Sequence, residues 1–106
     1  MERIRVASFQ SLPEDAGLRV AVAGRCLALF RVGGEVFALD DRCSHAEALL
    51  SEGPVYDGVV ECPRHGAGFD LRTGAPLSLP ATRPVPVYRT EVEGGEVFVY
   101  AAEGAA

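Results

Sequence analysis

"CSHAEALLSEGPVYDGVVECPRHGAGFD", residues 43–70, contains both histidines of the chain and two of its three cysteines. The four side chains form two mixed pairs, Cys43 with His45 and Cys62 with His65. Thiolate sulfur and imidazole nitrogen are ligands that suit transition metals. Two matched pairs in one short stretch therefore predict a metal centre rather than four unrelated residues.

Three interpretations of this stretch are open on its residues alone. The four side chains could be grouped by accident, or they could close a tetrahedral zinc site of two cysteines and two histidines. Zinc-finger spacing usually pairs cysteine with cysteine and histidine with histidine, whereas here each loop is mixed. A two-iron, two-sulfide cluster has two distinct irons, so each loop can give its cysteine to one iron and its histidine to the other.

The sequence on both sides of this stretch alternates polar and apolar residues with a period of two, which is typical of β-strands. Gly33-Gly34 and Gly94-Gly95 separate pairs of such runs and predict two hairpins. Pro84 and Pro86 predict that one strand enters at a sheet edge. The expected strands cover residues 3–9, 18–23, 25–32, 35–40, 85–93 and 96–102.

Residues 41–83 are rich in glycine and proline and contain weaker strand signals. We expect a short hairpin of residues 59–62 with 69–71, and at most single helical turns at 13–17 and 45–53. The sequence thus predicts one all-β domain, residues 1–106, with about eight to ten short strands. The ligand-bearing part, about 41–83, is expected to be inserted in a β scaffold made of residues 1–40 and 84–102.

Composition excludes several classes of function. The chain has 106 residues, 48% of them hydrophobic, and a net charge of −5, which argues against a nucleic-acid partner. No run approaches the ~20 apolar residues of a membrane span. The N-terminus lacks the apolar stretch of a signal peptide, so we expect a cytoplasmic protein. Cys26 lies in an alternating apolar run and is expected to be a buried, inert thiol.

The motif "CSH" followed by "CPRHGAGFD" resembles the Rieske signature, Cys-x-His then Cys-x-x-His. With the continuation to "RTG", the chain is similar to the small Rieske-type ferredoxins of bacterial ring-hydroxylating dioxygenases. The resemblance implies a Rieske-like antiparallel β-sandwich or barrel that binds a [2Fe-2S] cluster. Cys43 and Cys62 would hold the inner iron, and His45 and His65 the outer iron. Residues 74–81 would shield a third side of the cluster.

The resemblance implies a soluble, monomeric one-electron carrier that takes electrons from a reductase and passes them to an oxygenase or another acceptor. The chain is not expected to be an enzyme, since the cluster would use both histidines and leave none for a second, mononuclear iron. It also lacks a glycine-rich dinucleotide motif. The alternative is a zinc- or cluster-stabilised interaction or sensor module. Partners would dock at the cluster tip, which is expected to contain Ser44, Ala46, Glu47, Ala48, Gly66 and Ala67.

The chain departs from the high-potential Rieske proteins at four positions. Ala48 and Arg64 replace the two cysteines that form a disulfide between the loops in those proteins. Ala67 and Phe69 replace a serine and a tyrosine whose hydroxyls donate hydrogen bonds to sulfur. Because such bonds stabilise the reduced cluster, we expect a potential at the low end of the Rieske range of about −150 to +300 mV.

Overall fold

The computed structural model describes residues 3–43, 48–64, 66–79 and 81–100. In these residues the chain forms ten β-strands and two single-turn 3₁₀ helices, which confirms the all-β class. None of the described helices is long or apolar enough to cross a membrane. The elements are β1 (Ile4–Ser8), η1 (Phe9–Ser11), β2 (Gly17–Val22), β3 (Arg25–Val32), β4 (Glu35–Asp40), η2 (Leu50–Glu52), β5 (Val55–Tyr56), β6 (Val59–Glu61), β7 (Gly68–Asp70), β8 (Val87–Tyr88), β9 (Thr90–Glu93) and β10 (Glu96–Val99).

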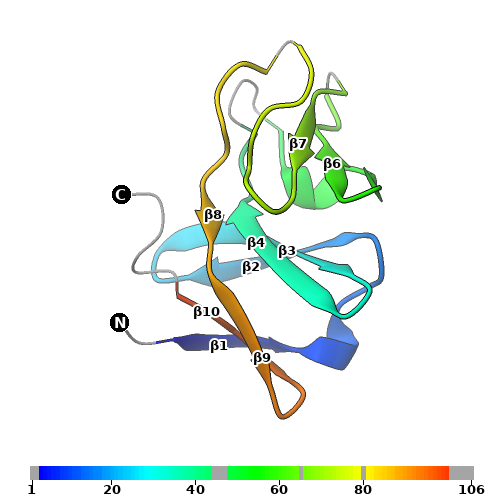
Figure 1. Ribbon diagram of the computed structural model, residues 1–106. Helices are drawn as coiled ribbons and strands as arrows, with labels where there is room; N and C mark the ends of the chain where they lie inside the picture. The colour runs from blue at the N-terminus through cyan, green and yellow to red at the C-terminus, as the bar shows by residue number, and fades with distance from the viewer. Residues whose placement is uncertain (1–2, 44–47, 65, 80, 101–106) are drawn as a thin grey trace.

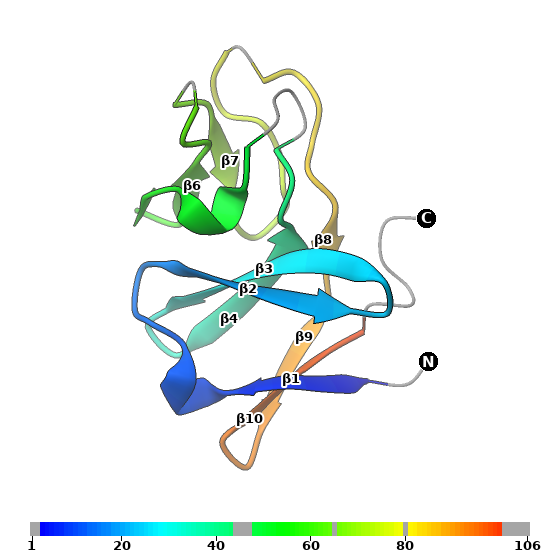
Figure 2. The ribbon, with the colours of Figure 1, turned by 180° about the vertical axis from the view of Figure 1, so that it is seen from behind.

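The strands form three antiparallel sheets, in the orders β1-β10-β9, β2-β3-β4-β8 and β5-β6-β7. The first two sheets are stacked in the lower half of Figure 1, and the third lies above them. The same arrangement is seen from behind in Figure 2. β8 is an edge strand, as Pro84 and Pro86 predict, and the chain passes from it directly into β9 of the other sheet.

Both glycine-glycine hairpins are confirmed. Gly33 and Gly34 connect β3 with β4, which pair continuously up to Val32 and Glu35. Gly94 and Gly95 connect β9 with β10, and their φ angles are 60° and 79°. Two successive positive φ angles are the requirement of a type I′ turn, which only residues such as glycine and asparagine meet at low cost.

The third sheet contains the expected hairpin of residues 59–62 with 69–71, observed as β6 and β7 with Val60 opposite Phe69. β5 was not expected from the sequence; it pairs with β6 through a two-residue turn at Asp57 and Gly58. These residues have φ angles of 53° and 73°. An Asp-Gly pair between two apolar runs is itself a hairpin signal and could have revealed β5.

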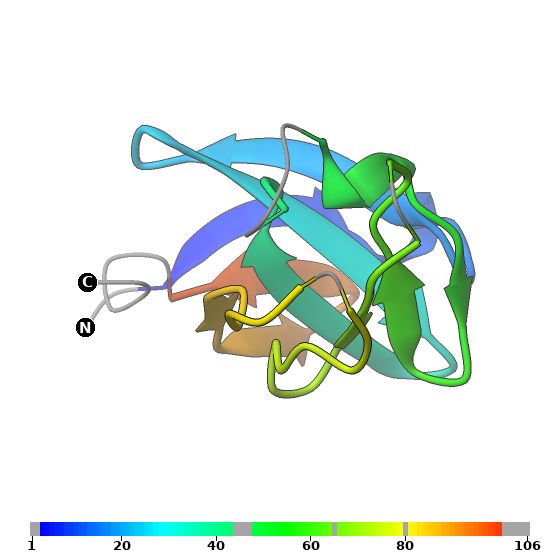
Figure 3. The same ribbon diagram turned by 90° about the horizontal axis from the view of Figure 1, so that it is seen from above.

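β3 is buried on both faces because two hydrophobic cores share it. Leu27 and Leu29 belong to what we call the scaffold core, and Ala28 and Phe30 to the insertion core. The scaffold core comprises Ala7, Leu12, Val22, Leu27, Leu29, Val36, Ala38, Tyr88, Val97 and Val99. The insertion core comprises Ala28, Phe30, Leu39, Cys43, Leu50, Val55, Val60, Cys62, Ala67, Phe69, Leu71, Ala81 and Val85. From above, the third sheet and the loops around it cover β3 and β4 (Figure 3).

The prediction that Cys26 is buried is wrong. Cys26 is exposed, and its Sγ accepts a hydrogen bond from Arg19 Nη2 at 3.0 Å. Alternation places it on the same face of β3 as Ala28 and Phe30, but the insertion core covers that face only from Ala28 onward. Cys26 pairs with Ala21 beside the β2–β3 turn, beyond the covered part of the strand.

The expected helical turn at 45–53 is observed in part as η2, while residues 45–47 lie outside the described residues. At 13–17, where at most one helical turn was expected, no helix forms. That segment forms bends and an isolated bridge between Glu14 and Arg31, and the 3₁₀ helix lies earlier, at η1. Glu14 pairs with Arg31 of β3, and this bridge forms in place of a local helical turn.

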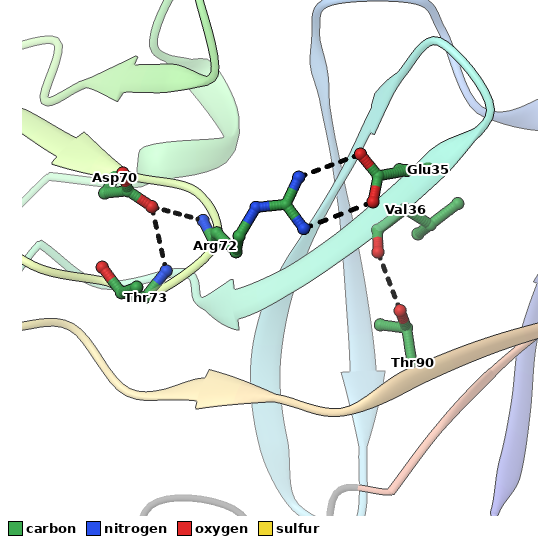
Figure 4. Close-up of polar contacts among 6 residues, drawn as sticks. All are labelled: Glu35, Val36, Asp70, Arg72, Thr73 and Thr90. Atoms are coloured by element: carbon green, nitrogen blue, oxygen red, sulfur yellow. Dashed lines mark hydrogen bonds and ion pairs between the residues drawn. The ribbon is translucent and has the colours of Figure 1, made fainter.

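Polar contacts also connect the third sheet to the scaffold (Figure 4). Arg72, in the turn after β7, donates to Glu35 of β4 at 3.3 and 3.0 Å, and Asp70 accepts from the Arg72 backbone N–H at 2.8 Å. Within the scaffold, Thr90 Oγ1 of β9 donates to the Val36 carbonyl of β4 at 2.7 Å and joins the two scaffold sheets. The Arg72–Glu35 pair is exposed and adds little stability, so the insertion is held mainly by its shared apolar core.

Candidate metal centre

The first ligand loop begins at Cys43, three residues after the end of β4 at Asp40. An antiparallel bridge between Arg42 and Leu49 closes its base. The Cys43 N–H donates to the Ala48 carbonyl at 3.0 Å. This pairing makes the loop a hairpin and fixes the backbone from which the Cys43 side chain projects.

The second ligand loop begins at Cys62, directly after β6, and has the same base. The Cys62 N–H donates to the Ala67 carbonyl at 2.8 Å, and the Gly66 N–H donates to the Cys62 carbonyl at 2.9 Å. Gly66 has a φ of 74°, a conformation that L-residues with a side chain rarely adopt. In each loop the cysteine N–H therefore donates to an alanine carbonyl five positions later, Ala48 or Ala67, so the bases of the two loops are closed by the same hydrogen bond.

Both cysteines are buried in the insertion core. Cys43 is 3% exposed and Cys62 is fully buried, and neither forms a disulfide. The other members of this core are apolar, so both thiols lie in an apolar environment. Two buried, unoxidised thiols brought into one apolar cluster by two loops fit the donor set of an iron–sulfur centre.

His45 and His65 lie outside the described residues. Within the residues that the structure describes, no group of three or more His, Cys, Asp or Glu side chains comes together. The complete set Cys43, His45, Cys62 and His65 therefore remains a prediction, supported so far by the placement of its two cysteines.

The structure corrects the expected docking tip. Ala67 is fully buried, because its carbonyl pairs with Cys62 and its methyl group joins the insertion core. Gly66 is exposed and Ala48 is half-buried, while Ser44, Ala46 and Glu47 lie outside the described residues. Glu61, beside Cys62, accepts a hydrogen bond from the Tyr56 hydroxyl, which raises the pKa of that tyrosine.

Asp41, two positions before Cys43, has the side chain that secures the first loop, and it is not among the site residues expected from the sequence. It is the one buried charged or polar residue in the described part of the chain. Its carboxylate accepts from the Ser51 N–H at 2.7 Å and Ser51 Oγ at 3.0 Å, and pairs with Arg19 Nε at 3.2 Å. Its carbonyl accepts from the Leu50 N–H at 2.6 Å. Asp41 thus joins β2, η2 and the base of the loop.

An open cavity of about 690 Å³ lies beside the first loop, on the side of Arg19 and Asp41. Its walls are mostly charged, and neither Cys43 nor Cys62 lines it. The lining residues are Arg19, Arg25, Cys26, Asp40, Asp41, Arg42, Ala48 and Leu49.

Comparison with known proteins shows which family the chain resembles. A family model described as "Rieske [2Fe-2S] domain" matches residues 2–89, which is more than half of the chain. The 3-phenylpropionate/cinnamic acid dioxygenase ferredoxin subunit of Escherichia coli (strain K12) is 47% identical over 100 residues, 93% of each chain.

Solved structures show the same similarity. The ferredoxin of carbazole 1,9a-dioxygenase from Nocardioides aromaticivorans IC177 is 38% identical, with a TM-score of 0.90 over 93% of this chain and 97% of that one. A chain in the complex of reduced oxygenase and oxidized ferredoxin in carbazole 1,9a-dioxygenase is 40% identical, with a TM-score of 0.86 over 92% and 91%.

The burial of the thiols predicts their reactivity. In the native protein, iodoacetamide should modify Cys26 alone, because Cys43 and Cys62 are buried. After denaturation in the presence of a chelator, all three cysteines should react. Intact-mass and peptide mass spectrometry measure both states, and Cys26→Ser is the control that should take up no label when native. Equal native labelling of Cys43 or Cys62 would contradict the observed burial.

The Asp41 contacts predict a local stability effect. Asp41→Ala leaves the Ser51 N–H without its acceptor and should cost about 1–3 kcal/mol, which lowers the melting temperature by at least about 4 °C. Asp41→Asn retains an acceptor oxygen and should cost less. Thermal melting followed by circular dichroism at a fixed scan rate measures both. Glu35→Ala, which removes an exposed ion pair, is the control; an equal loss in this variant would argue against a special role for Asp41.

Proposed function

Because the chain belongs to the Rieske [2Fe-2S] domain family, it is an electron-transfer protein, and we propose that it passes single electrons from a reductase to the oxygenase of a ring-hydroxylating dioxygenase. The observation that carries this proposal is the pair of buried thiols, Cys43 and Cys62, at the bases of two matched loops. The bound cluster supplies the redox chemistry by accepting and releasing one electron. The chain itself binds, shields and presents that group.

The proposed ligands follow the family motif. Cys43 and Cys62 hold one iron, and His45 and His65 hold the other. The burial of both cysteines supports their assignment to the inner iron, since a thiolate buried in an apolar core is protected from water and oxidants. Residues 41–83 then act as a cluster-binding subdomain of a single domain, set in a scaffold of residues 1–40 and 84–102.

The chain is a component of an oxygenase system rather than the oxygenase. Its relatives are named as ferredoxins or ferredoxin subunits, and with both histidines on the cluster none remains for a mononuclear iron of two histidines and a carboxylate. We place it in the cytoplasm as a monomer. The three cysteines, none of them in a disulfide, fit a reducing compartment.

Nitrogen coordination is the direct test of this function. The reduced protein should give an electron paramagnetic resonance signal that disappears on oxidation, with ¹⁴N couplings in pulsed spectra. Growth with ¹⁵N-histidine should replace these couplings, and because the chain has only two histidines the assignment is unambiguous. His45→Ala and His65→Ala should each lose one of the two histidine contributions to the couplings, or lose the cluster.

Two results would contradict the proposal. A cluster without histidine couplings would mean that cysteines or other residues are the ligands. A colourless protein with stoichiometric zinc, which shows no redox activity, would favour the interaction or sensor module instead.

The surroundings of the cysteines predict a low midpoint potential. Ala67 and Phe69 are both fully buried near Cys62 and carry no hydroxyl. Ala67→Ser and Phe69→Tyr should each raise the midpoint potential by about 60 mV, equivalent to ~1.4 kcal/mol for one electron, if the new hydroxyl donates to sulfur. Protein-film voltammetry measures the shift.

The matched control is Ala38→Ser, which adds the same hydroxyl in the scaffold core on the other face of the sheet. It should leave the potential unchanged even where it lowers stability. A wild-type midpoint above about +100 mV, in the upper part of the Rieske range, would contradict the predicted effect of Ala67 and Phe69.

A further inference from the structure

Two large apolar side chains are exposed on the segment that follows β7. Leu77 is 54% exposed and Leu79 is 79% exposed, the latter more than any other large apolar residue in the described part of the chain. Single exposed leucines are common on protein surfaces. Two on one short segment, however, form a patch whose burial by a partner would release water from apolar surface.

The segment is held in a fixed position against β7. The Leu77 N–H donates to the Gly68 carbonyl at 2.8 Å, and Ser78 Oγ accepts from the Gly68 N–H at 2.9 Å. Upstream, the Asp70 N–H donates to the Ala75 carbonyl at 2.9 Å. Ser78 thus faces β7, and the leucines on either side of it are presented to solvent by an ordered backbone.

This patch adjoins the second ligand loop. Gly68, which binds the segment on both its N–H and its carbonyl, directly follows Ala67, the residue that closes the Cys62 loop. In Figures 1 and 2 the yellow segment after β7 rises to the same end of the molecule as the β6–β7 loop and the chain leaving β4. A protein that approaches this end must also approach the leucines.

The segment carries no charge. Residues 74–82 contain no ionisable side chain, although charged residues make up 24% of the chain. A partner can therefore cover the leucines without removing water from an ion. The complementary surface on the partner is itself apolar rather than acidic or basic.

We propose that Leu77 and Leu79 form the apolar centre of the surface that docks the electron-accepting oxygenase. This inference rests on the proposed function. The cluster is held by two loops at one end of the molecule, so an acceptor that takes its electron there covers the end on which the two leucines lie. The solved complex of a 40% identical ferredoxin chain with an oxygenase makes the oxygenase the occupant to test.

The test compares Leu77→Ser, Leu79→Ser and the double variant in cluster-loaded protein. Val92→Ser is the matched control, because Val92 is 43% exposed and lies on β9, at the opposite end of the molecule. The probe is the oxygenase of the 3-phenylpropionate/cinnamic acid dioxygenase of Escherichia coli, whose ferredoxin is 47% identical. Stopped-flow reduction of this oxygenase by prereduced ferredoxin gives the apparent Kd and the limiting rate.

The double variant should raise the apparent Kd about tenfold or more, equivalent to ~1.4 kcal/mol per tenfold, at both low and high salt. Its midpoint potential, resonance spectrum and melting temperature should match the wild type, and Val92→Ser should bind within about twofold of the wild type.

Three other outcomes would each contradict a specific part of this proposal. Unchanged binding of the double variant overturns the docking assignment. If a variant still reduces the oxygenase normally but is no longer reduced by the reductase, the patch binds the electron donor and not the oxygenase. A wild-type protein that holds its cluster but reduces no oxygenase counts against the proposed function, whatever the leucine variants do.

Discussion

The backbone hydrogen bonds from Cys43 and Cys62 to the Ala48 and Ala67 carbonyls are the constraint on which the rest of the structure depends. They close the two loops at equal length and place both thiols inside one apolar core. A cluster held by both loops would need the two thiols in one core. A shift of either cysteine by one residue would turn its thiol toward solvent. Asp41 at the base of the first loop and the positive φ of Gly66 in the second support these two bonds.

β3 connects the two ligand loops to the rest of the domain, because it contributes residues to both hydrophobic cores. Leu27 and Leu29 pack in the scaffold core, while Ala28 and Phe30 pack against the insertion on the opposite face of β3. The loops therefore rest on a strand that the scaffold sheets already hold rigidly from the other side. For an electron carrier this arrangement is useful, because a rigid ligand frame limits the structural change that accompanies gain and loss of an electron.

The sequence was sufficient for features that depend on local patterns. Alternation and glycine pairs predicted the long hairpins, and two mixed ligand pairs predicted the metal centre. Cys26 was misplaced because alternation tells which face a residue is on but not where that face is covered. The sequence misplaces Ala67 because a small residue in a loop suggests an exposed tip, whereas the hydrogen bond from the Cys62 N–H to its carbonyl holds Ala67 in the core. Asp41 could not be found, since Arg19, Asp41 and Ser51 meet only after folding.

The two kinds of surface on this molecule suit different steps of a transient encounter. Charged side chains act at a range of up to about one Debye length, ~8 Å at physiological salt, and so influence the approach of a partner. Leu77 and Leu79 act only on contact, and burying them adds to the lifetime of the complex. Two leucines form a small patch, and electron-transfer encounters generally bury less than about 1,200 Å². A carrier that must leave one partner before it meets the next needs an interface of this kind, since a larger apolar face would slow its release and with it the flow of electrons.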